Sequence, residues 1–173
     1  DVLQACTEAV GMPQWTEEEH RFARELQKQA GVPETGLRAE ISPMVQRPMI
    51  PAGNDSGDIS WKVPMGRLMF PTNVPQTTFH HWTAGAALTT SIAHKGSEAG
   101  AKVLAMSVIA FLENQALVDA ARETFREEIG DTVYRPLLAE NQAPPPAELN
   151  RDLMERFRPQ MSEHYVRERP AFG

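Results

Sequence analysis

Cysteine is nearly absent from this sequence of 173 residues, with Cys6 as its single example. One thiol excludes a disulfide framework and any zinc site built from several cysteines. Basic residues are also scarce: 17 Lys and Arg stand against 23 Asp and Glu, for a formal net charge of −6. Such a surface does not attract polyanions, so we expect no nucleic-acid partner. No apolar run reaches the roughly 18 residues that cross a bilayer, so we expect no membrane partner.

Several short catalytic motifs are missing as well. The sequence contains no His-Glu-x-x-His, no Cys-x-x-Cys and no Gly-x-Ser-x-Gly. This removes the common zinc-peptidase helix and the hydrolase nucleophile turn from consideration. The chain does not begin with methionine, and we expect it to be a processed product or a piece of a longer protein. Its composition, with 41% hydrophobic and 23% charged residues, is that of an ordinary globular domain.

Helical patterns occupy both ends of the chain, and we predict helices at residues 17–29, 97–113, 115–129 and 147–157. Thr16 and Glu19 form a capping-box pattern at the first of these helices. The helix at 97–113 is apolar nearly all round, so we expect it to be buried at the centre of the fold. Pro159 is expected to end the last helix.

The segment from residue 32 to residue 90 is rich in proline, which disfavours long helices. Two short strands are plausible there, at residues 38–41 and 66–70. A polar, glycine-bearing loop at residues 53–58 is of the kind that carries function. We therefore predict an α/β fold, with a few strands covered by three or four helices.

Two histidine-bearing segments precede the central helix. His94 is expected just before the helix begins, where backbone amides attract anions, and Lys95 adds a positive charge. Together they could hold a substrate carboxylate. The second segment is His80-His81-Trp82, and neutral imidazole is a common ligand of zinc and manganese.

Each of these residues also has a structural interpretation. A lone histidine such as His80 is more often hydrogen-bonded within the fold than bound to a metal. Asp58 could supply a carboxylate ligand or could cap a turn. Trp61 and Trp82 are more often core or pocket wall than substrate contacts.

Four segments occur in a recognisable order. They are DSGDISWKVP at 55–64, FHHW at 79–82, IAHKG at 92–96 and AGAKVLA at 99–105. This series resembles the amidohydrolases similar to aminobenzoyl-glutamate utilisation protein B, which belong to the metallopeptidase superfamily of aminoacylases and carboxypeptidase G. The resemblance covers about residues 7–129.

The resemblance implies a cytoplasmic hydrolase with two zinc or manganese ions. Its substrate would be an N-acyl amino acid or an aminobenzoyl-glutamate-like amide with a free carboxylate, cleaved by metal-activated water. It also implies that residues 1–130 are the part of a zinc-peptidase-like αβα sandwich that follows a lid domain. Residues 131–173 would form a C-terminal extension with one short helix.

The resemblance also assigns candidate roles to residues. His80 matches the last metal ligand of the family, with Trp82 in the place of a family tryptophan and His81 as a competing ligand. We expect the substrate to be contacted by Asp58, Trp61, Trp82, His94 and Lys95.

Most of the family's catalytic machinery has no counterpart here. The His-x-Asp motif and the Glu-Glu pair are missing, and Glu17-Glu18-Glu19 is expected on a helix facing water. We therefore expect the general base to lie outside this chain, which alone is incomplete as an enzyme. The missing N-terminal part and lid domain would be its partners, in an oligomer. The alternative is a truncated, inactive homologue that serves as a binding or assembly module. A third, weaker possibility is a mononuclear metal site in which Asp58 joins His80, His81 or His94.

Overall fold

The structure is a computed structural model that describes residues 1–44, 54–146 and 148–165. The chain divides into two compact units, Asp1–Tyr134 and Arg135–Gly173. Every regular element in the described residues is helical, and none is a strand. The predicted α/β sandwich is therefore wrong.

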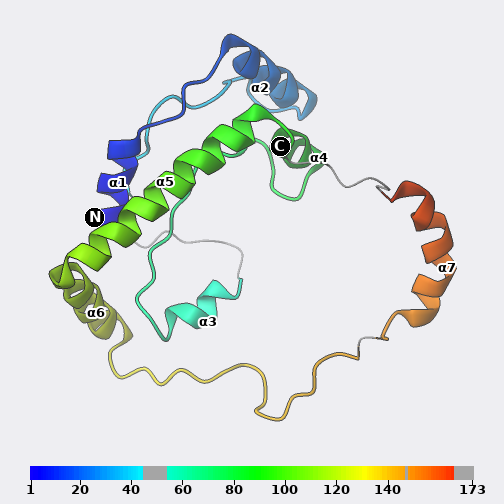
Figure 1. Cartoon of the computed structure of the whole chain (residues 1–173). Helices are drawn as coiled ribbons and strands as arrows, with labels where there is room; N and C mark the ends of the chain where they lie inside the picture. Colours follow the sequence, from blue (N-terminus) through cyan, green and yellow to red (C-terminus); the bar gives the residue numbers. More distant parts are fainter. Residues whose placement is uncertain (45–53, 147, 166–173) are drawn as a thin grey trace. The chain divides into compact units, whose positions relative to one another are not determined.

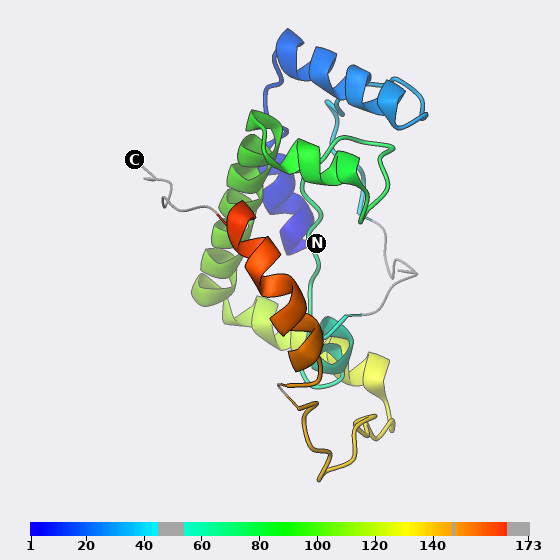
Figure 2. The same ribbon diagram turned by 90° about the vertical axis from the view of Figure 1, so that its right-hand side faces the viewer.

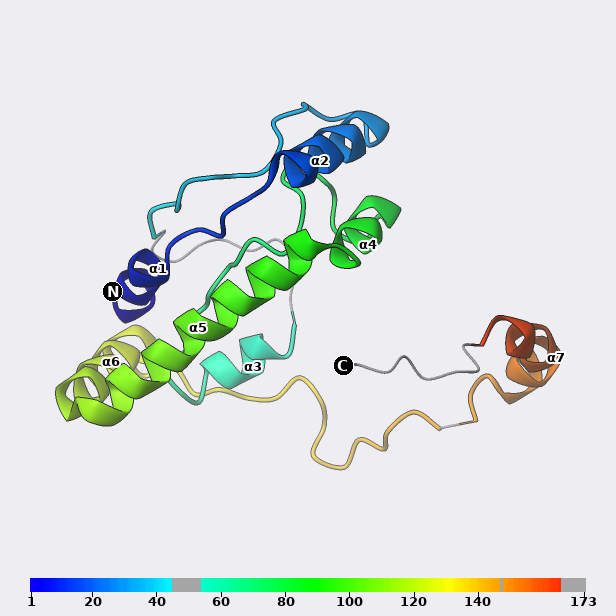
Figure 3. The same ribbon diagram turned by 45° about the horizontal axis from the view of Figure 1, so that its top comes forward.

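The first unit carries six helices among its described residues, drawn from blue to yellow-green in Figure 1. They are α1 (Val2–Val10), α2 (Glu17–Gln29), α3 (Ser56–Ser60), α4 (Trp82–Leu88), α5 (Ser91–Glu113) and α6 (Gln115–Ile129). Figure 3 shows α1 lying alongside α5, the longest helix. Figures 1 and 2 place α2 and α4 at the end of the unit where α5 begins.

Helix α2 has the bounds predicted from the sequence. Its capping box is formed: the Glu19 amide donates to Thr16 Oγ1 at 3.2 Å, and the Thr16 amide donates to Glu19 Oε2 at 2.7 Å. These two bonds satisfy amides that the first helical turn leaves free. The capping-box prediction is confirmed.

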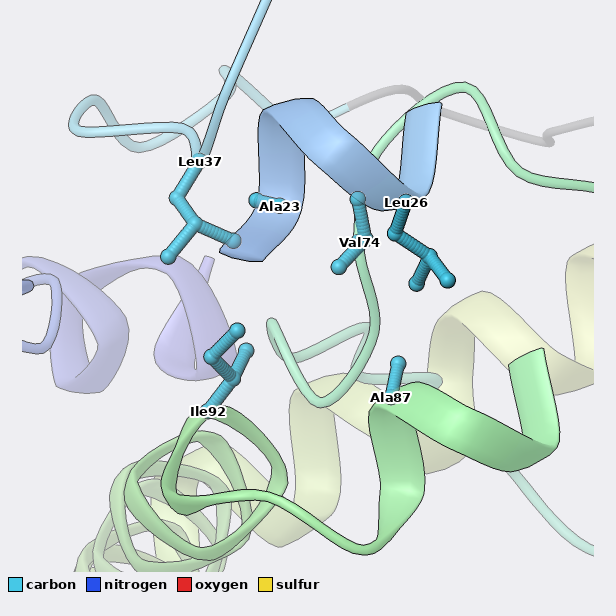
Figure 4. Packing of buried hydrophobic residues seen from close by; sticks show 6 residues of the cluster. All are labelled: Ala23, Leu26, Leu37, Val74, Ala87 and Ile92. Atoms are coloured by element: carbon cyan, nitrogen blue, oxygen red, sulfur yellow. The ribbon is translucent and has the colours of Figure 1, made fainter. Parts of the chain in front are cut away.

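A small hydrophobic cluster joins α2 to α4 and α5. Its buried members converge in Figure 4 and are Ala23, Leu26, Leu37, Val74, Ala87 and Ile92. Leu37 and Val74 come from irregular segments, so the core depends on loops as much as on helices. The cluster therefore brings together residues that are far apart in the sequence.

The buried side chain of Gln27 holds the two irregular segments around Gly36 and Pro75 by hydrogen bonds. This side chain is fully buried, and its amide nitrogen donates to the carbonyls of Gly36 at 3.1 Å and Pro75 at 3.0 Å. Its carbonyl oxygen accepts from the Gly36 amide at 2.8 Å. A buried amide with these partners specifies one loop arrangement, because any other would leave polar groups unsatisfied.

The two segments predicted as strands, residues 38–41 and 66–70, are irregular in the structure and make other contacts. The Arg38 carbonyl accepts a hydrogen bond from Trp15 Nε1 at 2.8 Å, rather than from a neighbouring strand. Phe70 and Pro71 lie directly on α5, where a Cβ at Gly100 would be 2.6 Å from the Phe70 ring and one at Gly96 would be 2.2 Å from the Pro71 carbonyl oxygen. The segment that we expected to form a strand packs on a helix, because glycines let its backbone approach closely.

Helix α5 begins at Ser91, six residues before the predicted start, and ends at Glu113 as predicted. Asn114 then caps α6, its side chain accepting from the Ala116 amide at 3.1 Å. The predicted burial holds for only part of α5: Ile92 and Val103 are buried, but Leu104 is 48% exposed and Leu112 is 80% exposed. In the described part of the chain, no single helix is long and apolar enough to span a membrane. Helices α5 and α6 meet that criterion only as a pair, bent by 99°.

The second unit contains α7 (Arg151–Met161), followed by a 3-10 turn at Ser162–His164. The helix begins four residues later than predicted and passes through Pro159, so the expected break there is wrong. Apolar side chains recur every four residues along it and are exposed: Leu153, Phe157 and Met161. This unit has an amphipathic helix without a buried core among its described residues.

Candidate functional site

Helix α3 carries the first two predicted site residues. Asp58 lies within it, and Trp61 directly follows it. The hydroxyl of Tyr134 donates to Asp58 Oδ1 at 2.5 Å, and the Tyr134 ring stacks on Trp61 with a centroid distance of 6.3 Å and an interplanar angle of 20°. The Lys62 ammonium lies 4.9 Å from the centre of the same ring. Because the Asp58 carboxylate accepts a hydrogen bond from the protonated phenol, the pKa of Tyr134 is raised.

His80 and His81 lie just before α4 and differ in their surroundings. His80 is exposed and has a φ of +61°, a left-handed conformation that residues other than glycine rarely adopt. The Nδ1 of His81 is 2.9 Å from the hydroxyl of the fully buried Thr83, and its ring is 5.6 Å from that of Trp82. The His81 ring is thus held by its neighbours, whereas the His80 imidazole faces solvent. Trp82 is also exposed.

Lys95 and His94 lie inside α5, because that helix begins earlier than predicted. The Lys95 ammonium donates to Glu19 Oε2 at 2.8 Å and to the Gln14 carbonyl at 2.9 Å. The Ser91 hydroxyl donates to the other carboxylate oxygen of Glu19 at 2.6 Å. Lys95 therefore joins α5 to α2. The His94 side chain is exposed.

Glu19 is the buried centre of this network, with 7% of its side chain exposed. The expectation that it faces water is wrong. Burial alone would raise the pKa of Glu19, but hydrogen bonds from Lys95, from Ser91 and from the Thr16 amide outweigh that effect and lower the pKa to about 2. Glu19 is therefore ionised at neutral pH and tied into the fold.

A shallow groove of about 530 Å³ runs between residues 10–14 and one face of α5. Its floor is largely apolar and includes Ala99, Met106 and Ile109, with Lys95 and Lys102 among its polar lining. Of the predicted site residues, Lys95 is in the described lining and the others are not. The groove therefore does not unite the predicted substrate contacts.

The described residues do not make a metal centre by themselves. Among them, no group of three or more His, Cys, Asp and Glu side chains could hold a metal ion. The mononuclear site considered from the sequence, with Asp58 and a histidine, is thus not part of a group of three such ligands in this part of the chain. A stable centre needs several converging ligands, so any metal would have to find most of them elsewhere.

Two residues that matter to the local geometry were missed from the sequence. Tyr134 follows α6 in an unremarkable segment, and no sequence signal connects it to Asp58, 76 positions earlier. Glu19 had a partial signal, because the capping-box pattern fixes its place at the start of α2. Nothing in that pattern shows that its carboxylate also reaches α5.

Comparison with known proteins shows that the chain is similar to a subunit of a hydrolase. That relative belongs to the p-aminobenzoyl-glutamate hydrolase of Escherichia coli (strain K12) and is 25% identical over 162 residues. The match covers 79% of this chain and 34% of the relative, so the chain spans about a third of the relative's length. No family model and no solved structure matches the chain. The resemblance drawn from the sequence is confirmed, at low identity.

Proposed function

We propose that this chain is part of an amidohydrolase that cleaves an N-acyl amino acid or an aminobenzoyl-glutamate-like substrate. The observation that carries the proposal is the similarity to the p-aminobenzoyl-glutamate hydrolase subunit along 79% of the chain. A cytoplasmic location and a divalent metal, zinc or manganese, belong to the same proposal. The general base and most metal ligands would be supplied by polypeptide outside this chain.

His80 is the residue of this chain that we assign to such a shared metal centre. Its imidazole is exposed, and its left-handed backbone is a strained conformation of the kind that accumulates at functional sites. His81 remains the competitor, although its Nδ1 lies against Thr83. Because the described residues alone do not fit a complete centre, we assign no reaction step to a metal here.

The substrate contacts are proposed for three places, at α3, α4 and α5. Asp58 and Trp61 would act from α3, and Trp82 from the start of α4. His94 is exposed near the start of α5 and could meet a substrate carboxylate. Lys95 is also proposed to do so, although its ammonium already bonds Glu19 and the Gln14 carbonyl.

The test is metal content and hydrolysis of p-aminobenzoyl-glutamate, measured on this chain together with the polypeptide proposed to complete the enzyme. The informative substitution is His80→Asn, because asparagine tolerates the left-handed backbone at this position while the imidazole is lost. His81→Asn tests the competing ligand, and His164→Asn is the control in the second unit. We expect metal and hydrolysis to fall together in His80→Asn and to be unchanged in the control. Hydrolysis that survives His80→Asn and is lost with His81→Asn would reassign the ligand to His81.

The second candidate function is a non-catalytic binding or assembly module. The exposed second half of α5 favours it, because Val108 and Ile109 are each more than half exposed and Leu112 is 80% exposed. Contiguous apolar surface of this kind marks an interaction site. The occupant would be the missing part of the hydrolase or a second copy of the chain. A chain that still associates, but binds no metal and hydrolyses no amide even with the polypeptide proposed to complete the enzyme, would support this candidate over the first.

A further inference from the structure

We infer that Tyr134 is a positioning residue, which holds α3 in place and so orients Asp58 and Trp61. The inference rests on the proposed function in so far as those two residues contact a substrate. The contacts themselves are independent of that function. Tyr134 lies 76 positions from Asp58 in sequence and meets α3 and the two residues that follow it with both its hydroxyl and its ring.

Helix α3 needs such an anchor. It has five residues, none of them buried, and its N-cap residue Asp55 makes no side-chain capping bond. So short a helix is unstable without tertiary contacts, because nucleation costs more than a few hydrogen bonds return. Its other side-chain bonds are local, as in the Ser60 hydroxyl donating to the Gly57 carbonyl at 2.7 Å. Within the described residues, its one side-chain hydrogen bond to a distant position is that between Asp58 and Tyr134.

The three contacts of Tyr134 constrain different motions. The hydrogen bond fixes the Asp58 carboxylate along the phenol O–H direction, and its length of 2.5 Å is typical of a charged acceptor. The nearly parallel stacking restricts rotation of the Trp61 ring. The Lys62 ammonium over the ring adds a third contact on the same residue. One side chain therefore sets the orientation of both proposed substrate contacts.

Two substitutions separate these effects. Tyr134→Phe keeps the ring and removes the hydroxyl, whereas Tyr134→Ala removes both. The chain has two tyrosines, so Tyr165→Phe in the second unit is a matched control. In hydrogen-exchange mass spectrometry of the full chain, we expect exchange at residues 57–62 to quicken about threefold in Tyr134→Phe and about tenfold in Tyr134→Ala. Exchange in α2 should be unchanged, which shows that the protein still folds.

A second readout tests orientation rather than local stability. Binding of p-aminobenzoyl-glutamate is followed by calorimetry for the same variants, each combined with the polypeptide proposed to complete the enzyme. The positioning role is supported if Tyr134→Ala binds most weakly, Tyr134→Phe binds more tightly than that, and the unsubstituted protein binds most tightly. Tyr165→Phe should bind as the unsubstituted protein does. Unchanged exchange at residues 57–62, or unchanged affinity despite faster exchange, overturns the positioning role. If the unsubstituted protein itself does not bind this amide, the proposed substrate is wrong, and the exchange measurement alone decides whether Tyr134 holds α3.

Discussion

The two halves of α5 differ in sequence and in surroundings: residues 91–102 include serine, histidine, lysine and glutamate, whereas residues 103–113 are almost all apolar. In the first half, Ile92 and Ala93 are buried, and Lys95 reaches the buried carboxylate of Glu19. In the second half, Leu104, Val108 and Leu112 are all about half exposed or more. Apolar composition therefore does not determine burial. The first half is covered because it offers specific features to the rest of the chain. In the second half, Val103 and Ser107 are buried, but most of the apolar side chains are left exposed within the described residues.

Those features of the first half are small residues and one partly buried ion pair. Gly96 and Gly100 admit the backbone of Pro71 and the ring of Phe70. Lys95 and Ser91 of α5 bond to Glu19 of α2 and so join the two helices. If this difference is correct, substitutions in the first half should destabilise the fold, and those in the second half should alter association instead.

The largest effect is expected for Ile92→Ala. Ile92 is 1% exposed in the central cluster, and removing such a side chain costs about 2–5 kcal/mol from lost burial and the cavity left behind. Ile109→Ala, on the exposed half of the same helix, should cost less than about 1 kcal/mol. Free energies of unfolding from urea denaturation compare the two. Equal losses would mean that the second half is as well packed as the first.

Gly96→Ala is expected to have the next largest effect on the free energy of unfolding. A Cβ there would lie 2.2 Å from the Pro71 carbonyl oxygen, which is backbone and cannot turn aside. We expect a net loss of about 2 kcal/mol, because the clash outweighs the better helix propensity of alanine. Gly85→Ala in α4 is the matched control, with open space around its Cβ and an expected gain of about 0.5–1 kcal/mol. A stabilised Gly96→Ala protein would show that Pro71 does not rest on α5.

The fold was predictable where the sequence carries local signals. The capping box of Thr16 and Glu19, and the cap at Asn114, predicted correctly where α2 and α6 begin. The strand at residues 66–70 was not predictable in the same way. An apolar run such as Leu68-Met69-Phe70 suits a strand or a helix-packed segment, and only the glycines of α5, far along the chain, decide between them.

The candidate site was less predictable than the fold. The residue pattern picked out Asp58 and Trp61, but it could not reveal Tyr134, because a pairing over 76 positions leaves no local periodicity. The start of α5 was placed too late, so His94 and Lys95 were expected before the helix rather than within it. Lys95 consequently looked free to bind an anion, whereas its ammonium already bonds a carboxylate.

The third prediction concerns pH. The pKa of Glu19 is about 2 in the folded protein against an ordinary 4.5, so its stabilising contribution is complete above pH 4.5 and is lost as the pH falls from there towards 2. At neutral pH, Glu19→Gln should cost about 1–2 kcal/mol. This is less than the whole pKa shift would give, because the Lys95 side chain is 34% exposed and solvent screens the pair.

Urea denaturation at several acidic pH values checks this. The unsubstituted protein should lose stability more steeply below pH 4.5 than Glu19→Gln does. Glu18→Gln is the control, since that side chain is 84% exposed one position away. Parallel pH profiles for Glu19→Gln and the unsubstituted protein would remove Glu19 from the account of how α2 and α5 are joined.

The smallest effect on stability is expected for Leu112→Lys. This substitution tests most directly whether the second half of α5 serves association rather than stability. Leu112 is 80% exposed, so the free energy of unfolding should change by no more than about 0.5 kcal/mol. Association should change much more, because a charge within an apolar contact surface opposes its burial. We expect sedimentation velocity to show an associating protein that becomes more monomeric with Leu112→Lys. Gln115→Lys adds the same charge without removing apolar surface and should associate as before. A monomeric unsubstituted protein would mean that the exposed half of α5 is not a contact surface between copies.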